Sequence, residues 1–102
     1  MKSYKLHSEA VQRIEEIWNF TYENWGYEKA DEYTFEIEEK IKKLCDGLMN
    51  GKRYELISKF EIYYIQYNKH YIFYQEDDNT IFVLTILHHS MNIPKRIIGL
   101  LT

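Results

Sequence analysis

Cysteine is nearly absent from this sequence, and positive charge is in the minority. A disulfide within the chain needs two thiols, and Cys45 is the one cysteine among the 102 residues. We therefore expect a reducing compartment, the cytoplasm. Thirteen Lys and Arg residues face sixteen Asp and Glu residues, which gives a net charge of -3. A protein with this balance has no overall positive field that would attract nucleic acid or anionic lipid.

Long hydrophobic runs are missing as well. Residues 1–5 carry no apolar stretch typical of a signal peptide. No segment approaches the ~20 apolar residues needed to cross a bilayer, so we expect no membrane anchor. Hydrophobic residues nevertheless make up 45% of the chain and aromatic residues 17%, far from the composition of disordered chains. We expect a single domain spanning residues 1–102, with one core and no linker.

Two segments carry apolar residues at the spacing of an amphipathic helix. The first contains Val11, Ile14, Trp18, Tyr22 and Trp25, and the second contains Ala30, Tyr33, Ile37, Ile41, Leu44 and Leu48. Ser8 suits a helix cap, Gly26 suits a left-handed helix end, and Gly51 suits a break after the second series. The short connection predicts a helical hairpin, with both tryptophans in the core.

After Gly51 the sequence turns to β-branched and aromatic residues. Extended segments are predicted at residues 54–57, 60–67, 70–76 and 80–88, besides a short strand at residues 4–6. The predicted fold class is α+β: an N-terminal strand and a helical hairpin packed on a twisted antiparallel sheet, in the order β-α-α-β-β-β. Alternation places Ile81, Val83, Thr85 and Leu87 on one face of the last strand and Phe82, Leu84, Ile86 and His88 on the other. Both faces are largely apolar, which predicts that the hairpin covers one and a partner chain the other.

A series of short motifs runs through the chain in a fixed order. They are Ser8, Trp25-Gly26, Ala30 with Tyr33, Gly51-Lys52, Ile72-Phe73-Tyr74, Ile86-Leu87-His88 and Met91-Asn92. Their order and spacing over about 90 residues resemble the ParE branch of the ParE/RelE superfamily, the toxins of bacterial type II toxin-antitoxin systems. The resemblance implies a toxin that inhibits DNA gyrase by protein-protein binding. It also implies a ParD-like antitoxin that neutralises the toxin in a hetero-oligomer by laying a segment across its groove.

Two other functions stay open. RelE-like relatives cleave messenger RNA on the ribosome, so a ribosome-dependent endoribonuclease is the first alternative, and a non-toxic module that binds an antitoxin and regulates transcription is the second. RNA cleavage of this kind needs fixed cations around the phosphorane. Residues 60–67 contain no Lys or Arg, and Gln75 stands where the family often has Arg. The sequence therefore favours the gyrase inhibitor, with no catalytic residue, no cofactor and no sequence-specific nucleic-acid binding, although an acid-base pair could still come from His70, Tyr74, Glu76, His88 and His89.

Candidate partner-binding residues lie at the end of the last strand and in the tail: Gln75, His88, His89, Met91, Asn92, Lys95 and Arg96. His88 matches the histidine of the family, and a structural histidine that fixes the strand end is an equal alternative. Neighbours in a strand point to opposite faces, so His88 and His89 are not expected to share a metal ion, and no metal site is expected. Asn92 suits a helix cap and Pro94 a first helical turn, which predicts a short helix or an apolar arm in the tail.

Overall fold

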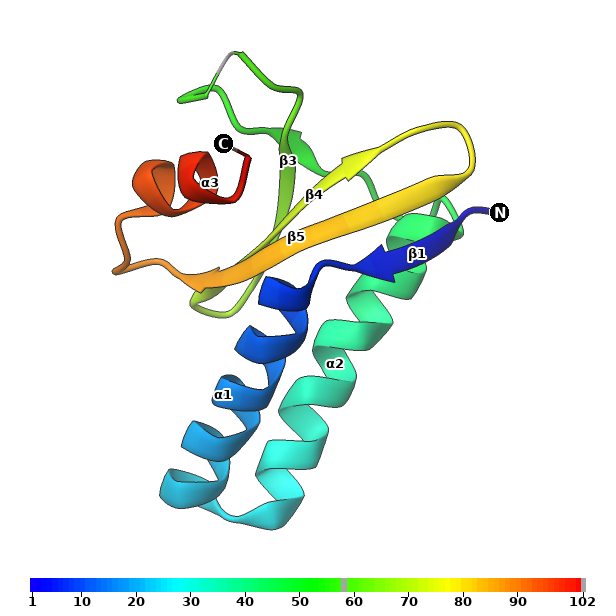
Figure 1. Cartoon of the computed structure of the whole chain (residues 1–102). Helices are drawn as coiled ribbons and strands as arrows, with labels where there is room; N and C mark the ends of the chain where they lie inside the picture. Colours follow the sequence, from blue (N-terminus) through cyan, green and yellow to red (C-terminus); the bar gives the residue numbers. More distant parts are fainter. Residues whose placement is uncertain (58, 102) are drawn as a thin grey trace.

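A helical hairpin packs against one face of a sheet in the computed structural model (Figure 1), which describes residues 1–57 and 59–101. The elements are β1 (Ser3–Leu6), α1 (Ser8–Trp25), α2 (Tyr27–Cys45), β2 (Lys52–Arg53), β3 (Tyr63–Tyr67), β4 (His70–Glu76), β5 (Thr80–His88) and α3 (Ile93–Leu101). This order confirms the predicted α+β fold class. The expected domain range, 1–102, includes residues 58 and 102, which lie outside the described residues.

The sheet has five strands among the described residues, in the order β1-β5-β4-β3-β2. Strands β2 to β5 pair antiparallel, whereas β1 lies parallel to β5. The predicted antiparallel sheet forms from β2 to β5, and β1 joins its edge in parallel, which makes the whole sheet mixed. A parallel pair needs a long connection, which the helices and the intervening strands supply. The backbone N–H of His7 donates to the carbonyl of Val83 at 2.9 Å, and this bond holds the start of α1 beside β5.

The first helix buries a different stripe from the predicted one. Its buried residues are Ala10, Ile17 and Thr21, whereas Trp25 is 65% exposed. Small residues let α1 approach both α2 and β5, and Figure 1 shows that the lower part of the hairpin extends beyond the sheet. The prediction that Trp25 belongs to the core is therefore wrong. The helix cap also differs, because Nδ1 of His7 rather than Ser8 accepts the Glu9 N–H, at 3.0 Å.

The second helix follows its predicted stripe up to its last turn. Its buried residues are Ala30, Ile37, Ile41, Leu44 and Cys45. The helix ends at Cys45, so Leu48 lies beyond it and is 73% exposed. Gly26 joins the two helices at φ +92° and ψ 177°, a region that glycine alone adopts without strain.

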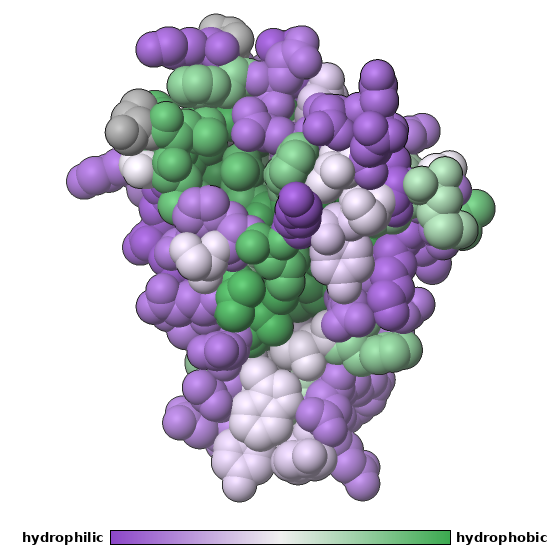
Figure 2. All heavy atoms as spheres, turned by 45° about the vertical axis from the view of Figure 1, so that its right-hand side comes forward, coloured by the Kyte–Doolittle hydropathy of each residue, from purple (hydrophilic) through white to green (hydrophobic). Residues whose placement is uncertain are grey.

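The second face of the sheet is covered by the chain itself, which corrects the expectation that a partner covers it. The strand predicted at residues 54–57 does not form, and the strand predicted at residues 60–67 begins at Tyr63. Side chains of Tyr54, Ile57, Phe60 and Ile62 pack with α3 on this face. The buried members of this second cluster are Ile57, Ile62, Phe73, Leu84, Leu87, Ile93 and Ile97. Figure 2 shows that hydrophobic residues still gather in a patch on one face of the molecule, bordered by hydrophilic ones. None of the described helices combines the length and the hydropathy that a membrane crossing requires.

An irregularity in β5 overturns the predicted alternation of its side chains. Phe73 lies opposite Thr85, but the next residue of β4, Tyr74, lies opposite Val83, so Leu84 is an extra residue. Such a β-bulge shifts every later side chain to the other face. Ile81, Val83 and Ile86 consequently join the cluster beneath the hairpin, and Leu84 and Leu87 join the cluster beneath α3.

Candidate functional site

A groove lies in the corner between the helical hairpin and the end of the sheet. Its volume is about 990 Å³. One wall comes from α1 and α2, and the other comes from the turn between β3 and β4, from the end of β5 and from the residues that follow it. The apolar residues of its lining are Ile17, Phe20, Trp25, Ile86 and Met91. A concave, largely apolar surface of this size is typical of a ligand or peptide site.

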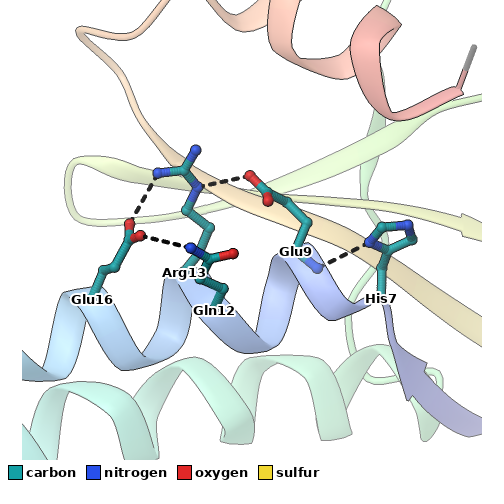
Figure 3. Close-up of polar contacts among 5 residues, drawn as sticks. All are labelled: His7, Glu9, Gln12, Arg13 and Glu16. Carbon is teal, nitrogen blue, oxygen red and sulfur yellow. Dashed lines mark hydrogen bonds and ion pairs between the residues drawn. The ribbon is translucent and has the colours of Figure 1, made fainter.

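Aromatic side chains and paired charges form the helical wall. Phe20 is 60% exposed, and its ring meets that of Trp25 edge to face at 6.2 Å. Figure 3 shows Arg13 reaching from the middle of α1 to two carboxylates, with Nε of Arg13 3.0 Å from Glu9 and a terminal nitrogen 3.0 Å from Glu16. These i,i+4 and i,i+3 contacts offset the charge of Arg13 and hold its side chain along the helix.

The opposite wall contains a half-buried histidine. Nδ1 of His70 lies 2.7 Å from the hydroxyl of Tyr33, and the rings of Tyr33 and Tyr67 lie 4.9 Å apart. Burial, followed by the nearby imidazoles of His88 and His89, lowers the pKa of His70 to about 4. Burial likewise raises the pKa of Tyr33. Both groups are therefore neutral near pH 7, and they join α2 to the first residue of β4.

His88 and His89 lie on the same side of the chain rather than on opposite faces, so the alternation predicted for them is wrong. Their rings stack at 4.4 Å, because β5 ends at His88 and the backbone turns there. Nδ1 of His88 accepts the backbone N–H of Ser90 at 3.2 Å and lies 2.7 Å from its hydroxyl. Burial lowers the pKa of His88, and His89 and Lys69 lower it further. Since Nδ1 is an acceptor, the proton of the neutral His88 ring is on Nε2.

The structure brings together only part of the predicted site. His88 and Met91 line the groove, and His89 is the residue next to His88 in the chain. Asn92 caps α3. Its side chain accepts the Lys95 N–H at 3.4 Å, and its carbonyl accepts the Arg96 N–H at 3.2 Å. Lys95 and Arg96 are exposed on the first turn of this helix. Gln75 lies opposite Phe82, near the other end of β4, and is separate from these residues. No group of three or more His, Cys, Asp or Glu side chains in residues 1–57 and 59–101 is placed to hold a metal ion.

Several groove residues were not among the predicted site residues, and His70 is one of them. His70 lies opposite His88 because of the bulge at Leu84, whereas counting back from the turn with Glu76 opposite Ile81 would place it opposite Leu87. Phe20 and Trp25 were unrecognisable as site residues, because helical periodicity does not reveal where a helix extends beyond its sheet.

Cations are few on the sheet and paired on the helical wall. Within the described parts of β3, β4 and β5 there is no Lys or Arg. On the helical wall, Arg13 pairs with Glu9 and Glu16, and Lys29 lies 3.8 Å from Glu32. The groove therefore offers an apolar surface and hydrogen-bonding groups rather than a cluster of fixed positive charges.

Comparison with known proteins agrees with this geometry. The sequence model of the ParE toxin of the type II toxin-antitoxin system, parDE, matches residues 4–93. The chain belongs to the ParE toxin family. It is 27% identical over 104 residues to Toxin ParE1 of Mycobacterium tuberculosis, covering 92% of this chain and 96% of that protein. It is 26% identical over 92 residues to Toxin ParE1 of Caulobacter vibrioides, covering 90% of this chain and 94% of that protein.

A solved structure shares the fold of this ParE family member. The chromosomal ParDE toxin-antitoxin system from P. aeruginosa contains a chain that superposes with a TM-score of 0.72 at 19% identity, over 86% of this chain and 96% of that one. At this identity the superposition shows the fold. The resemblance to ParE toxins that the sequence suggested is thus confirmed by the family match and by the two relatives.

Proposed function

We propose that this ParE family member stops bacterial growth by binding DNA gyrase in the cytoplasm, and that a cognate ParD-like antitoxin neutralises it. Its family is that of the toxins of type II toxin-antitoxin systems. The structural neighbour belongs to a ParDE pair, which supports a partner of the ParD kind for this chain. The exposed aromatic residues of the groove support contact with another protein, since aromatic residues are enriched in protein interfaces.

The observation that carries the choice of gyrase over RNA cleavage is the lack of cations on the three inner strands of the sheet, β3, β4 and β5. Cleavage by a neighbouring 2′-hydroxyl needs positive groups that stabilise charge in the transition state. The described strands β3, β4 and β5 contain no Lys or Arg, and His70, with a pKa of about 4, is neutral near pH 7. These features favour a toxin that acts by contact.

The test combines purified gyrase and purified ribosomes with the same preparation of toxin. With gyrase and supercoiled plasmid we expect linear DNA to accumulate, and we expect premixing with the antitoxin from the adjoining gene to prevent this. With translating ribosomes we expect intact messenger RNA, as read by primer extension. Transcript cleavage together with unchanged supercoiling would contradict the proposal and assign the ribosome as the target.

A further inference from the structure

One end of the groove carries hydrogen-bond donors and positive charge without a carboxylate. We define the His88 corner as Lys69, His88 and His89. The N–H of His89 donates to the carbonyl of Lys69 at 2.9 Å, so the β3–β4 turn and the end of β5 are joined there. The titratable side chains that influence the pKa of His88 are His89 and Lys69, and those that influence the pKa of His70 are His88 and His89. No acidic side chain is among them.

The lysine of this corner differs from the other cations that line the groove, because those cations form ion pairs with glutamates. Arg13 and Lys29 both pair with glutamates on their own helices. Lys69 is exposed, and no ion pair involves it among the described residues. His88 uses Nδ1 to accept from Ser90, which leaves its Nε2–H as a donor. The corner can therefore bind an anionic group that the chain itself does not provide.

The lining of the rest of the groove favours a peptide carboxylate over a nucleic-acid phosphate as the anionic group bound at the corner. Beyond the corner the lining turns apolar, with Phe20 and Trp25 exposed at the helical wall. Glu16 and Glu32 also line this wall, and Glu32 and Glu36 are close enough to help raise the pKa of Tyr67. A nucleic-acid strand that followed the groove would meet these carboxylates. A peptide with a single acidic residue at one end and apolar residues along the rest avoids that repulsion.

We propose that the His88 corner binds a carboxylate of an acidic, amphipathic segment of the antitoxin, whose apolar side chains lie in the groove against Phe20 and Trp25. This assignment rests on the proposed function, because it takes the antitoxin as the occupant. To the proposed function it adds the direction in which the segment lies, with its acidic residue at the end of β5 and its apolar residues toward the tip of the helical hairpin. Electrostatic complementarity of this kind fixes the register of a bound chain.

The test is a titration of the full toxin with the antitoxin produced from the adjoining gene, at several salt concentrations. Lys69→Glu should raise Kd about tenfold or more and reduce its dependence on salt, because the reversed charge repels the carboxylate. Lys52→Glu makes the same charge change at an exposed lysine of β2 that does not line the groove, and its Kd should stay within about twofold of the unmodified toxin. Circular dichroism should show both variants folded.

A second measurement identifies the partner group. A photo-crosslinker at position 69 should attach to an acidic stretch of the antitoxin, and changing that acidic residue to Lys should restore binding to Lys69→Glu. Equal affinity of Lys69→Glu and Lys52→Glu would overturn the assignment while leaving the pairing intact. Binding of a labelled single-stranded oligonucleotide that depends on Lys69 would overturn it in favour of a phosphate surface. Absence of any complex between the unmodified toxin and the antitoxin would overturn the pairing itself, and the assignment with it.

Discussion

The hydroxyl of Tyr33 lies 2.7 Å from Nδ1 of His70, and this contact joins the helical hairpin to the sheet at the floor of the groove. Tyr33 comes from the middle of α2, and His70 is the first residue of β4. When the His70 proton lies on Nε2, the hydroxyl donates to Nδ1. Burial holds His70 neutral and Tyr33 protonated, so the contact persists near neutral pH.

The low pKa of His70 predicts that stability falls as the pH falls. The folded-state pKa is about 4, against an ordinary value of 6.5, so the unfolded chain binds the proton more readily. The free energy of unfolding should therefore decrease between about pH 6.5 and pH 4, by up to ~3 kcal/mol from this residue. Urea unfolding across this range measures the slope. His70→Gln should reduce the slope, whereas His7→Gln, at the start of α1, should retain it; equal slopes in both variants would contradict the assignment to His70.

Removing the Tyr33 hydroxyl should destabilise the fold by about 1–2 kcal/mol. Tyr33→Phe deletes one hydrogen bond and leaves Nδ1 of a half-buried imidazole without its partner. Chemical denaturation at about pH 7.5 measures the change, and Tyr27→Phe is the control, because Tyr27 is 62% exposed and should change stability by less than about 0.5 kcal/mol. A cost of Tyr33→Phe no larger than that of the control would show that the contact contributes nothing.

Most of the fold could be predicted because its signals are local. The buried stripe of α2 follows from the helical spacing of its apolar residues. The bounds of β4 and β5 agree with the predicted segments 70–76 and 80–88. The bulge at Leu84 and the parallel pairing of β1 could not be predicted in this way, because both depend on which strands meet across long stretches of sequence. The cover that Tyr54, Ile57, Phe60 and Ile62 give to the second sheet face has the same long-range origin.

Only the part of the site at the end of β5 and just after it was predicted from the sequence. His88 and Met91 were recognised because the family motif and the strand end coincide, and both line the groove. Trp25 was assigned to the core because its spacing fits an apolar stripe. Its exposure follows from the length of the hairpin relative to the sheet, which no spacing along the helix encodes.

Glycine is required at position 51 by a tyrosine from β4. The Gly51 N–H donates to the hydroxyl of Tyr74 at 2.9 Å, and a Cβ on residue 51 would overlap the hydroxyl and the adjoining ring atoms. Gly51→Ala should therefore destabilise by about 1–3 kcal/mol, as overpacking against a buried side chain does, because Tyr74 is only 2% exposed. Gly99→Ala is a control of opposite sign: a Cβ there meets no atom within 4 Å, and α3 should gain about 0.5–1 kcal/mol. Thermal unfolding of both variants measures the two effects, and equal shifts would contradict the Tyr74 contact.

Trp25 should matter for binding and not for folding. Because its side chain is 65% exposed, Trp25→Ala should change the free energy of unfolding by less than about 1 kcal/mol. Its loss should weaken antitoxin binding by about 1–3 kcal/mol, because an exposed tryptophan in a groove is typical of an interface anchor. Phe35→Ala is the matched control, since Phe35 is 57% exposed on α2 and does not line the groove. Calorimetric titration compares the three proteins. An equal loss of affinity in both variants would place the antitoxin elsewhere on the hairpin, because of these two residues only Trp25 lines the groove.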